Sequence, residues 1–140
     1  MTTPTKKISI LHAETQTLAR IRLEELLSTQ DTIIQYQSVS NRRDLLKNIS
    51  SLMPDVLVFN YGEVVSFSIA DLFKIRHDFP QIKILVLSCD NNHSRVKSIM
   101  QSGVSGYVFS NVDEQEIIDA VFAVSRGEVV ISDEGLEGLI

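Results

Sequence analysis

The apolar residues of this chain follow two alternating patterns. Short continuous runs rich in Val, Ile, Leu and Phe are typical of buried strands, whereas apolar residues repeated every three or four positions are typical of helices that cover a sheet. The runs that predict strands are residues 7–12, 33–39, 56–59, 82–88 and 106–109. A polar stretch and then a segment with helical spacing follow each run, so the pattern predicts strands that alternate with helices.

The segments between the predicted strands contain residues that are typical of helix N-termini. Capping-box spacing marks two of these starts, at Asn41 with Asp44 and at Ser68 with Asp71. Hydroxyl side chains in residues 15–17 are expected to cap the first helix, which is predicted to bury one continuous apolar stripe. The residues of that stripe are Leu18, Ile21, Leu23, Leu26 and Leu27.

Strands that alternate with helices form a parallel sheet covered on both faces, because each right-handed crossover places its helix over the sheet. Five strands predict an α/β, flavodoxin-like (βα)5 three-layer sandwich with strand order 2-1-3-4-5 and a ligand crevice between strands one and three. Residues 129–131 are left open between a short terminal strand and an extended tail. We expect residues 1–140 to form one domain, with a core at 6–127 and a tail or the start of a linker at 128–140.

Composition narrows the classes of function. The net charge of the 140-residue chain is −5, its pI is about 5.1, and its thirteen Lys and Arg residues are dispersed, which argues against binding of nucleic acid by this domain alone. The single cysteine, Cys89, excludes an internal disulfide, suits a reducing compartment and is expected to pack as a small apolar residue. The amino-terminal residues do not predict a signal peptide or a membrane span, so we expect a cytoplasmic protein without membrane contact.

The chemistry of the predicted sheet centres on the stretch 54–63. The apolar run 56–59 ends at Asn60, and the carboxyl ends of parallel strands are where such sheets display ligands and reactive groups. The residue displayed there is an amide and not a carboxylate. His12 and Glu14, at the end of the first strand, have metal-ligating side chains, but the sequence offers no third ligand beside them, so packing is the favoured interpretation.

Four segments, in order and at fitting spacing, resemble the receiver domain of two-component response regulators over nearly the whole chain. These segments are 54–59, 79–88, 103–108 and 116–127. The last two resemble the NarL/FixJ subfamily, whose receivers precede a helix-turn-helix. The resemblance implies a non-enzymatic signalling domain, the N-terminal regulatory part of a transcriptional regulator, in which DNA is contacted only by a C-terminal domain outside this chain.

The resemblance also assigns active-site positions. The phosphoacceptor aspartate of the family falls on Asn60, whose amide cannot form an acyl phosphate. The two acids that hold Mg²⁺ fall on Ala13 and Glu14, so one acid is missing, magnesium binding is expected to be weak or absent, and no other cofactor is implied. The hydroxyl that contacts the phosphoryl group is kept as Ser88, and the aromatic switch residue is kept as Tyr107, which is equally expected to be a half-buried packing aromatic.

The family lysine that pairs with the phosphoryl group falls on Ser110, which removes a positive charge from the site. Together with Asn60 and Ala13, this change implies an atypical, phosphorylation-independent receiver. It is expected to form a homodimer or bind a partner protein through the face made by helix four, strand five and helix five, residues 94–126.

Two alternatives remain open. Asn60 could be an engineered substitution that traps an inactive form, although Ala13 and Ser110 differ from the family as well. The chain could also be a flavodoxin-like cofactor-binding protein or a small enzyme. Residues 15–17 contain no glycine to bring backbone amides close to a phosphate, and the chain has no tryptophan to stack on a flavin, so this alternative is disfavoured.

Overall fold

The computed structural model describes residues 7–61, 67–89, 92–109 and 113–131, and within them six strands and five helices alternate. The strands are β1 (Ile8–Ala13), β2 (Ile33–Val39), β3 (Val56–Asn60), β4 (Lys83–Ser88), β5 (Gly106–Phe109) and β6 (Val130–Ile131). The helices are α1 (Thr17–Ser28), α2 (Arg42–Leu52), α3 (Ile69–Asp78), α4 (His93–Gln101) and α5 (Glu114–Ser125).

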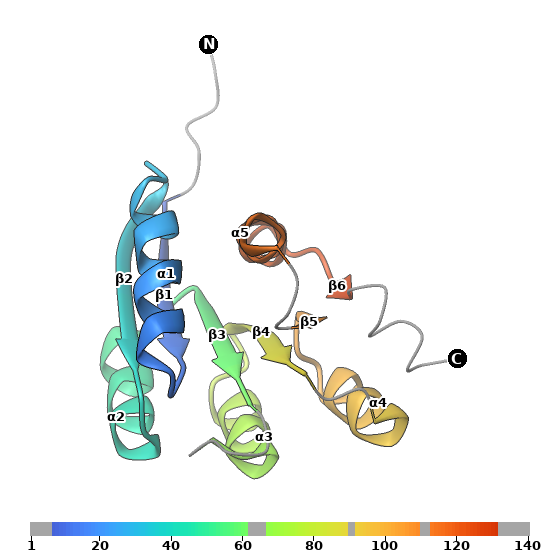
Figure 1. Ribbon diagram of the computed structural model, residues 1–140. Helices are drawn as coiled ribbons and strands as arrows, with labels where there is room; N and C mark the ends of the chain where they lie inside the picture. The colour runs from blue at the N-terminus through green and yellow to red at the C-terminus, as the bar shows by residue number, and fades with distance from the viewer. Residues whose placement is uncertain (1–6, 62–66, 90–91, 110–112, 132–140) are drawn as a thin grey trace.

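All strands are parallel, in the order β2-β1-β3-β4-β5-β6 (Figure 1). The predicted fold class and the predicted order of the first five strands are confirmed, and of the two alternatives left open for residues 129–131 the short terminal strand is the correct one, so the sheet has six strands where five were predicted. Residues 130 and 131 form a sixth strand, paired with Gly106 and Tyr107 of β5. A side-chain carbon at Gly106 would lie 2.9 Å from the carbonyl oxygen of Val130, so the close approach of β6 depends on this glycine.

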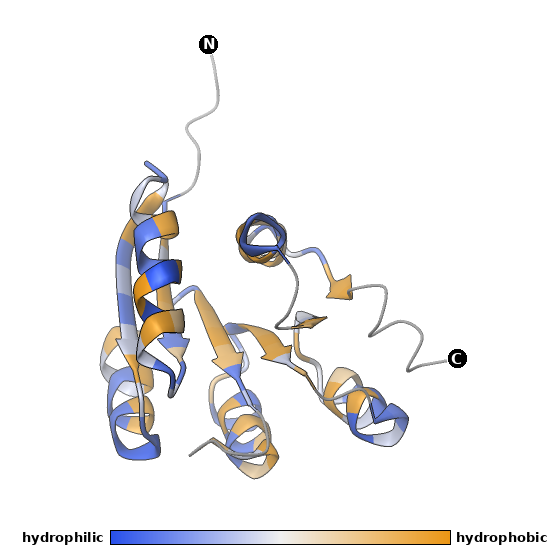
Figure 2. Cartoon of the chain, in the orientation of Figure 1, coloured by the Kyte–Doolittle hydropathy of each residue, from blue (hydrophilic) through white to orange (hydrophobic). Residues whose placement is uncertain are grey.

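The sheet is the middle of three layers. Helices α1 and α5 cover one face, and α2, α3 and α4 cover the other (Figure 1). Along β3, Leu57 and Phe59 join the core under α2–α4, whereas Val56 and Val58 join the core under α1 and α5. All four side chains are fully buried, as the continuous apolar run predicts, and the central strands are accordingly the most apolar part of the chain (Figure 2).

Of the two predicted capping boxes, the one formed by Ser68 and Asp71 is present, whereas Asn41 caps its helix in one direction only. Asn41 accepts a hydrogen bond from the backbone N–H of Asp44 at 2.8 Å, and Ser68 and Asp71 cap each other reciprocally at 3.2 Å. The hydroxyl cap predicted for α1 is wrong, because Gln16 occupies the N-cap position and its side chain makes no capping hydrogen bond. The start of α1 is thus held by fewer local contacts than the start of α3.

The predicted apolar stripe of α1 is only partly correct. Leu23 and Leu27 are buried against the sheet, but Leu18 is 67% exposed and Ile21 is 46% exposed. The physical reason is the helical repeat, since about 3.6 residues per turn place Leu18 half a turn around the helix from Leu27. A stripe that includes both residues is too wide for one face to bury.

Helices α2 and α3 are joined by an ion pair whose acid is buried. Nε of Arg42 lies 2.6 Å from the Asp71 carboxylate, and the Asp71 side chain is 7% exposed. Burial by itself raises the pKa of Asp71, but hydrogen bonds from Arg42 and Ser68 outweigh it and hold that pKa below its ordinary value. No helix in the described part of the chain has the length and apolar character needed to cross a membrane.

Candidate functional site

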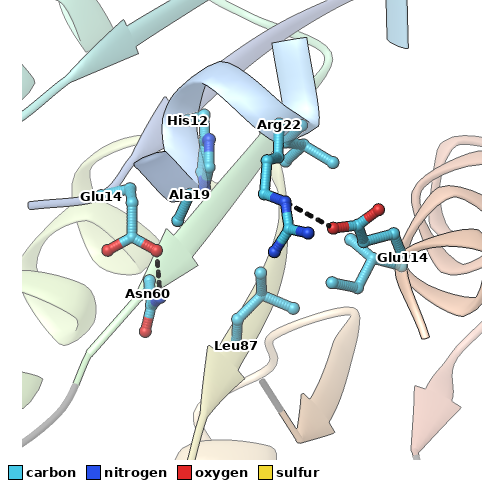
Figure 3. Close-up of a pocket in the computed structure, with 9 residues that line it drawn as sticks. His12, Glu14, Ala19, Arg22, Asn60, Leu87 and Glu114 are labelled. Carbon is cyan, nitrogen blue, oxygen red and sulfur yellow. Dashed lines mark hydrogen bonds and ion pairs between the residues drawn. The ribbon is translucent and has the colours of Figure 1, made fainter. Parts of the chain in front are cut away.

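The ends of β1 and β3 bring Glu14 and Asn60 together. Ala13 pairs with Phe59 in the sheet, so the residues that follow them lie side by side at its carboxyl edge. The side-chain amide of Asn60 donates a hydrogen bond to one oxygen of Glu14, and the backbone N–H of Gln16 donates to the other oxygen at 3.3 Å (Figure 3). Glu14 is 4% exposed. Among the residues that the structure describes, the hydrogen bonds to this nearly buried carboxylate come from neutral donors, and the guanidinium of Arg20 donates to the backbone carbonyl of Glu14 at 3.0 Å.

The residues at this edge do not fit the magnesium ion of receiver domains. Glu14 contributes one carboxylate, which already accepts a hydrogen bond from the Asn60 amide, and Ala13 is fully buried and has no side-chain oxygen. Mg²⁺ requires several oxygen ligands in near-octahedral geometry. Among the residues that the structure describes, no group of three or more His, Cys, Asp and Glu side chains could hold a metal ion.

The other predicted positions lie at the ends of β4 and β5. Ser88 ends β4 and is fully buried, as is Tyr107 of β5, whose hydroxyl lies 3.4 Å from that of Tyr61. Ser110 lies outside the described residues. The expected packing of Cys89 is wrong, because Cys89 is exposed: β4 ends at Ser88, and Cys89 follows beyond the sheet.

A pocket of about 230 Å³ lies beside the Glu14–Asn60 pair, on the side of the sheet covered by α1 and α5. Its polar lining residues are His12, Glu14, Arg22, Asn60 and Glu114, and its apolar ones are Ala19, Leu23, Leu87 and Ile117. Arg22 extends from α1 toward Glu114 of α5, with Nε 3.5 Å from the carboxylate, and both side chains are partly exposed (Figure 3). This ion pair forms the rim of the pocket.

His12 is 1% exposed, and its Nδ1 lies 2.8 Å from the hydroxyl of Tyr36. Burial, with a smaller contribution from the charge of Arg20, lowers the pKa of His12 to about 3, so the imidazole is neutral at pH 7. Burial and then the charge of Glu24 raise the pKa of Tyr36, so the phenol keeps its proton. Within the described part of the chain, Nε2 of His12 has no hydrogen-bond partner.

Several residues of this site could not be predicted from the sequence. Arg22 and Glu114 lie on helices that are far apart along the chain, and no local pattern relates them. The position of Tyr36 could have been predicted from the sequence. Side chains alternate along neighbouring strands, which places Tyr36 on the same face of the sheet as Ile10 and His12. His12 and Glu14 line the same pocket, although neither has a third ligand with which to hold a metal.

The sheet order and the two helix layers define an α/β, flavodoxin-like fold. The chain is similar in sequence to the response regulator protein VraR of Staphylococcus aureus strain Mu3, with 27% identity over 129 residues that cover 92% of this chain and 62% of VraR. This chain thus spans somewhat under two thirds of the length of that relative. No protein-family model matches it.

Solved structures agree on the fold. The isolated REC domain of RcsB from Salmonella enterica serovar Typhimurium, in the presence of the phosphomimetic BeF3⁻, has a TM-score of 0.81 at 16% identity, covering 96% of this chain and all of that chain. RcsB in a structure of two dimers bound to two parallel DNAs has a TM-score of 0.84 at 16% identity, covering 94% of this chain and 66% of that chain. The predicted resemblance to response regulator receiver domains is confirmed.

Proposed function

We propose that this chain is a phosphorylation-independent receiver domain and has no enzymatic activity. The observation that carries the proposal is the hydrogen bond from the amide of Asn60 to the carboxylate of Glu14. That bond joins the position of the family's phosphoacceptor to the position of one of its metal-binding acids. An amide and a carboxylate are complementary without a cation between them, whereas two carboxylates at this separation would repel each other.

The carboxyl edge of the sheet lacks the groups that phosphoryl transfer to a receiver domain requires: the acceptor carboxylate, a second metal-binding acid and a positive charge. The amide of Asn60 is not a nucleophile that forms an acyl phosphate, and Ala13 supplies no metal ligand. Ser110, which replaces the family lysine in the sequence, would supply no positive charge to the transferring group. Magnesium binding, if present, is expected to be weak, because a single engaged carboxylate is a poor site for a hard cation.

The proposal extends to the protein of which this domain would be the regulatory part. RcsB dimers bind DNA in one of the similar structures, and VraR is longer than this chain. We place the present domain at the amino-terminal end of such a regulator, in the cytoplasm, with DNA contacted by a separate domain. The exposed thiol of Cys89 suits a reducing compartment.

Self-association is proposed through the face that α4, β5 and α5 form, residues 94–126. Lys97 is exposed on α4, and Glu116 and Asp119 are exposed on α5. A twofold pair of identical faces would bring these opposite charges together. Analytical ultracentrifugation of Lys97→Glu should show a weaker dimer than the parent chain, and the double variant K97E/E116K should recover part of the association. An unchanged dimer in Lys97→Glu would place the interface elsewhere.

Incubation with acetyl phosphate and Mg²⁺, or with beryllofluoride and Mg²⁺, tests phosphorylation independence. We expect no phosphorylated mass, and no change in melting temperature or oligomeric state. A phosphorylated species in intact-mass spectrometry would refute the proposal.

Asn60→Asp sharpens the test, because it restores the acceptor alone. We expect this single variant to remain poorly phosphorylated, since Ala13 and Ser110 are unchanged. The triple variant A13D/N60D/S110K is the matched comparison, and it should accept the phosphoryl group faster than N60D does. Efficient labelling of the single variant would show that the acceptor alone decides the chemistry.

A further inference from the structure

The pocket between β1, β3, α1 and α5 has an apolar wall and a charged rim that a ligand can reach. Three aliphatic residues of the wall keep part of their surface exposed: Leu23 at 5%, Leu87 at 4% and Ile117 at 8%. At the rim, the side chains of Arg22 and Glu114 are 64% and 44% exposed. A ligand that enters the pocket can therefore meet an apolar surface and a guanidinium at the same time.

Arg22 has nitrogens that the fold does not use. Its Nε lies 3.5 Å from the carboxylate of Glu114, which is longer than the roughly 2.7–2.9 Å of a strong charge-assisted hydrogen bond. Among the described residues, its two terminal nitrogens make no hydrogen bond, and they extend toward Leu87 (Figure 3). A carboxylate of a ligand can accept from both terminal nitrogens in the bidentate geometry that a guanidinium favours.

Asn60 supplies a hydrogen-bond acceptor. Its side-chain nitrogen donates to Glu14, so its side-chain oxygen is left for another partner (Figure 3). Asn60 is partly exposed, and no hydrogen bond is donated to this oxygen within the described part of the chain. Among the described residues, Nε2 of His12 is the one buried side-chain nitrogen or oxygen without a partner, so the oxygen of Asn60 is not buried. Since Asn60 lines the pocket, an N–H group of a ligand can donate to this oxygen.

We propose that this pocket binds a small branched aliphatic amino acid. The α-carboxylate pairs with Arg22, the ammonium group donates to the side-chain oxygen of Asn60, and the aliphatic side chain packs against the apolar wall. A zwitterion fits the charges of the lining, because its ammonium group offsets the repulsion between its carboxylate and the carboxylates of Glu14 and Glu114. The volume of about 230 Å³ is below the range of roughly 300–1,000 Å³ that is usual for drug-sized ligands and suits a molecule of this size.

This inference rests on the proposed function, because a receiver that is not phosphorylated needs another input. Arg22 and Glu114 form a contact between α1 and α5 at the rim. The carboxylate of the ligand competes with Glu114 for Arg22, so binding should weaken this contact. Helix α5 belongs to the face proposed for self-association, residues 94–126, and the pocket is thereby linked to that face.

Three molecules with the same branched skeleton test the chemistry: valine, isovalerate, which lacks the ammonium group, and isobutylamine, which lacks the carboxylate. Binding is measured by titration of ¹⁵N-labelled protein, following the backbone amides of residues that line the pocket. We expect valine to bind with a dissociation constant of about 1–10 mM, as suits so small a ligand. Each analogue should bind at least about tenfold more weakly. Equal binding of either analogue, or binding by none of the three, would overturn the proposal.

Two charge variants test the role assigned to Arg22. Arg22→Gln should weaken valine binding by at least about tenfold, whereas Arg43→Gln, the same change at an exposed position of α2, should bind like the parent chain. Glu114→Gln removes the competitor for the guanidinium and should strengthen binding by about threefold. An equal loss in both arginine variants, or unchanged or weaker binding by Glu114→Gln, would overturn the proposal.

A filling variant locates the binding in the pocket. Ala19→Leu adds volume to the lining from α1 and should weaken valine binding by at least about tenfold. Ala70→Leu makes the same change at an exposed position of α3 and should bind like the parent chain. Unchanged binding by Ala19→Leu would place the ligand elsewhere and refute the proposal.

The acetyl phosphate assay on the parent chain separates this inference from the proposed function. A phosphorylated protein that still binds valine would refute the proposed function alone. An unphosphorylated protein that does not bind valine would refute this inference alone.

Discussion

Two regions of this domain bury an acid, and they stabilise it in different ways. Between α2 and α3, the side chain of Asp71 is 7% exposed and pairs with the guanidinium of Arg42. At the carboxyl edge of β1, Glu14 is 4% exposed, and its oxygens accept hydrogen bonds from the neutral side chain of Asn60 and a backbone N–H. The pairing of Asp71 with a cation is typical of a contact that stabilises the fold. Glu14 has neutral partners instead, so a further negative charge placed beside it should lower the stability of the domain.

The same contrast applies to His12, whose hydrogen-bond partner within the described part of the chain is the neutral phenol of Tyr36. Its pKa is lowered to about 3, so it stays neutral where the unfolded chain would be protonated. The two regions should therefore respond to acid over different ranges of pH. The pocket side loses stability below the ordinary pKa of histidine, and the α2–α3 contact loses stability only when Asp71 takes up a proton.

The largest expected effect is the pH dependence caused by His12. Since the folded state binds this proton only near pH 3 and the unfolded state binds it near pH 6.5, stability is constant above that range and falls within it. The slope should be about 1.4 kcal/mol per pH unit between pH 6 and pH 4. Urea unfolding measured across this range should show the slope in the parent chain and its loss in His12→Gln. A parallel slope in both proteins would assign the effect to other groups.

Asn60→Asp is expected to destabilise the domain by about 2 kcal/mol at pH 7, because it places a second carboxylate at a half-buried position beside the buried carboxylate of Glu14. The penalty should shrink as pH falls, since one of the two carboxyl groups then takes up a proton. Asn92→Asp is the matched control at the exposed N-cap of α4, where aspartate caps as well as asparagine does. Equal stability of the two variants would show that Glu14 does not sense the added charge.

Asp71→Asn should cost about 1–2 kcal/mol at neutral pH, because it removes the carboxylate that pairs with Arg42 and completes the capping box of α3. The pKa of Asp71 is lowered in the folded state, so this contribution is present above the ordinary pKa of aspartate and is lost as pH falls through the lowered value. Asp44→Asn, at the exposed start of α2, should cost less. Thermal unfolding at pH 7 and at pH 3 measures both.

The smallest expected effect is at the exposed side of α1. Leu18→Gln should change the free energy of unfolding by less than about 0.5 kcal/mol, since Leu18 is 67% exposed. Leu27→Ala, on the fully buried side of the same helix, should cost about 3 kcal/mol. Denaturant titration compares the two. A large loss in Leu18→Gln would mean that this side of α1 is covered in solution, as it would be in a dimer.

Most of the fold could be predicted from periodicity, and most of the site could not. Buried runs such as 56–59 predict strands because they have no polar face, and Ser68 with Asp71 predicts a helix start because both partners of the cap are local. The two-residue strand β6 is too short to have a period. Whether Leu18 or Leu27 faces the sheet depends on the angle at which α1 packs, which the helical repeat alone does not determine.

The candidate site shows the same division. Asn60 and Glu14 could be placed at one edge because strand ends are set by local sequence. The rim pair of Arg22 with Glu114 joins residues that are brought together only by the packed sheet. Whether Nε2 of His12 has a hydrogen-bond partner depends on all the side chains that surround it, and these come from several elements. Such a property follows from tertiary structure and has no signature in the sequence.

The short strand β6 is held less firmly than the rest of the sheet. Its pairing with β5 spans two residue pairs, so few backbone hydrogen bonds hold it, and it can open by local fraying while the core stays folded. Opening of β6 should cost much less free energy than unfolding of the domain, and it would expose the backbone of Gly106 and Tyr107 with which β6 pairs.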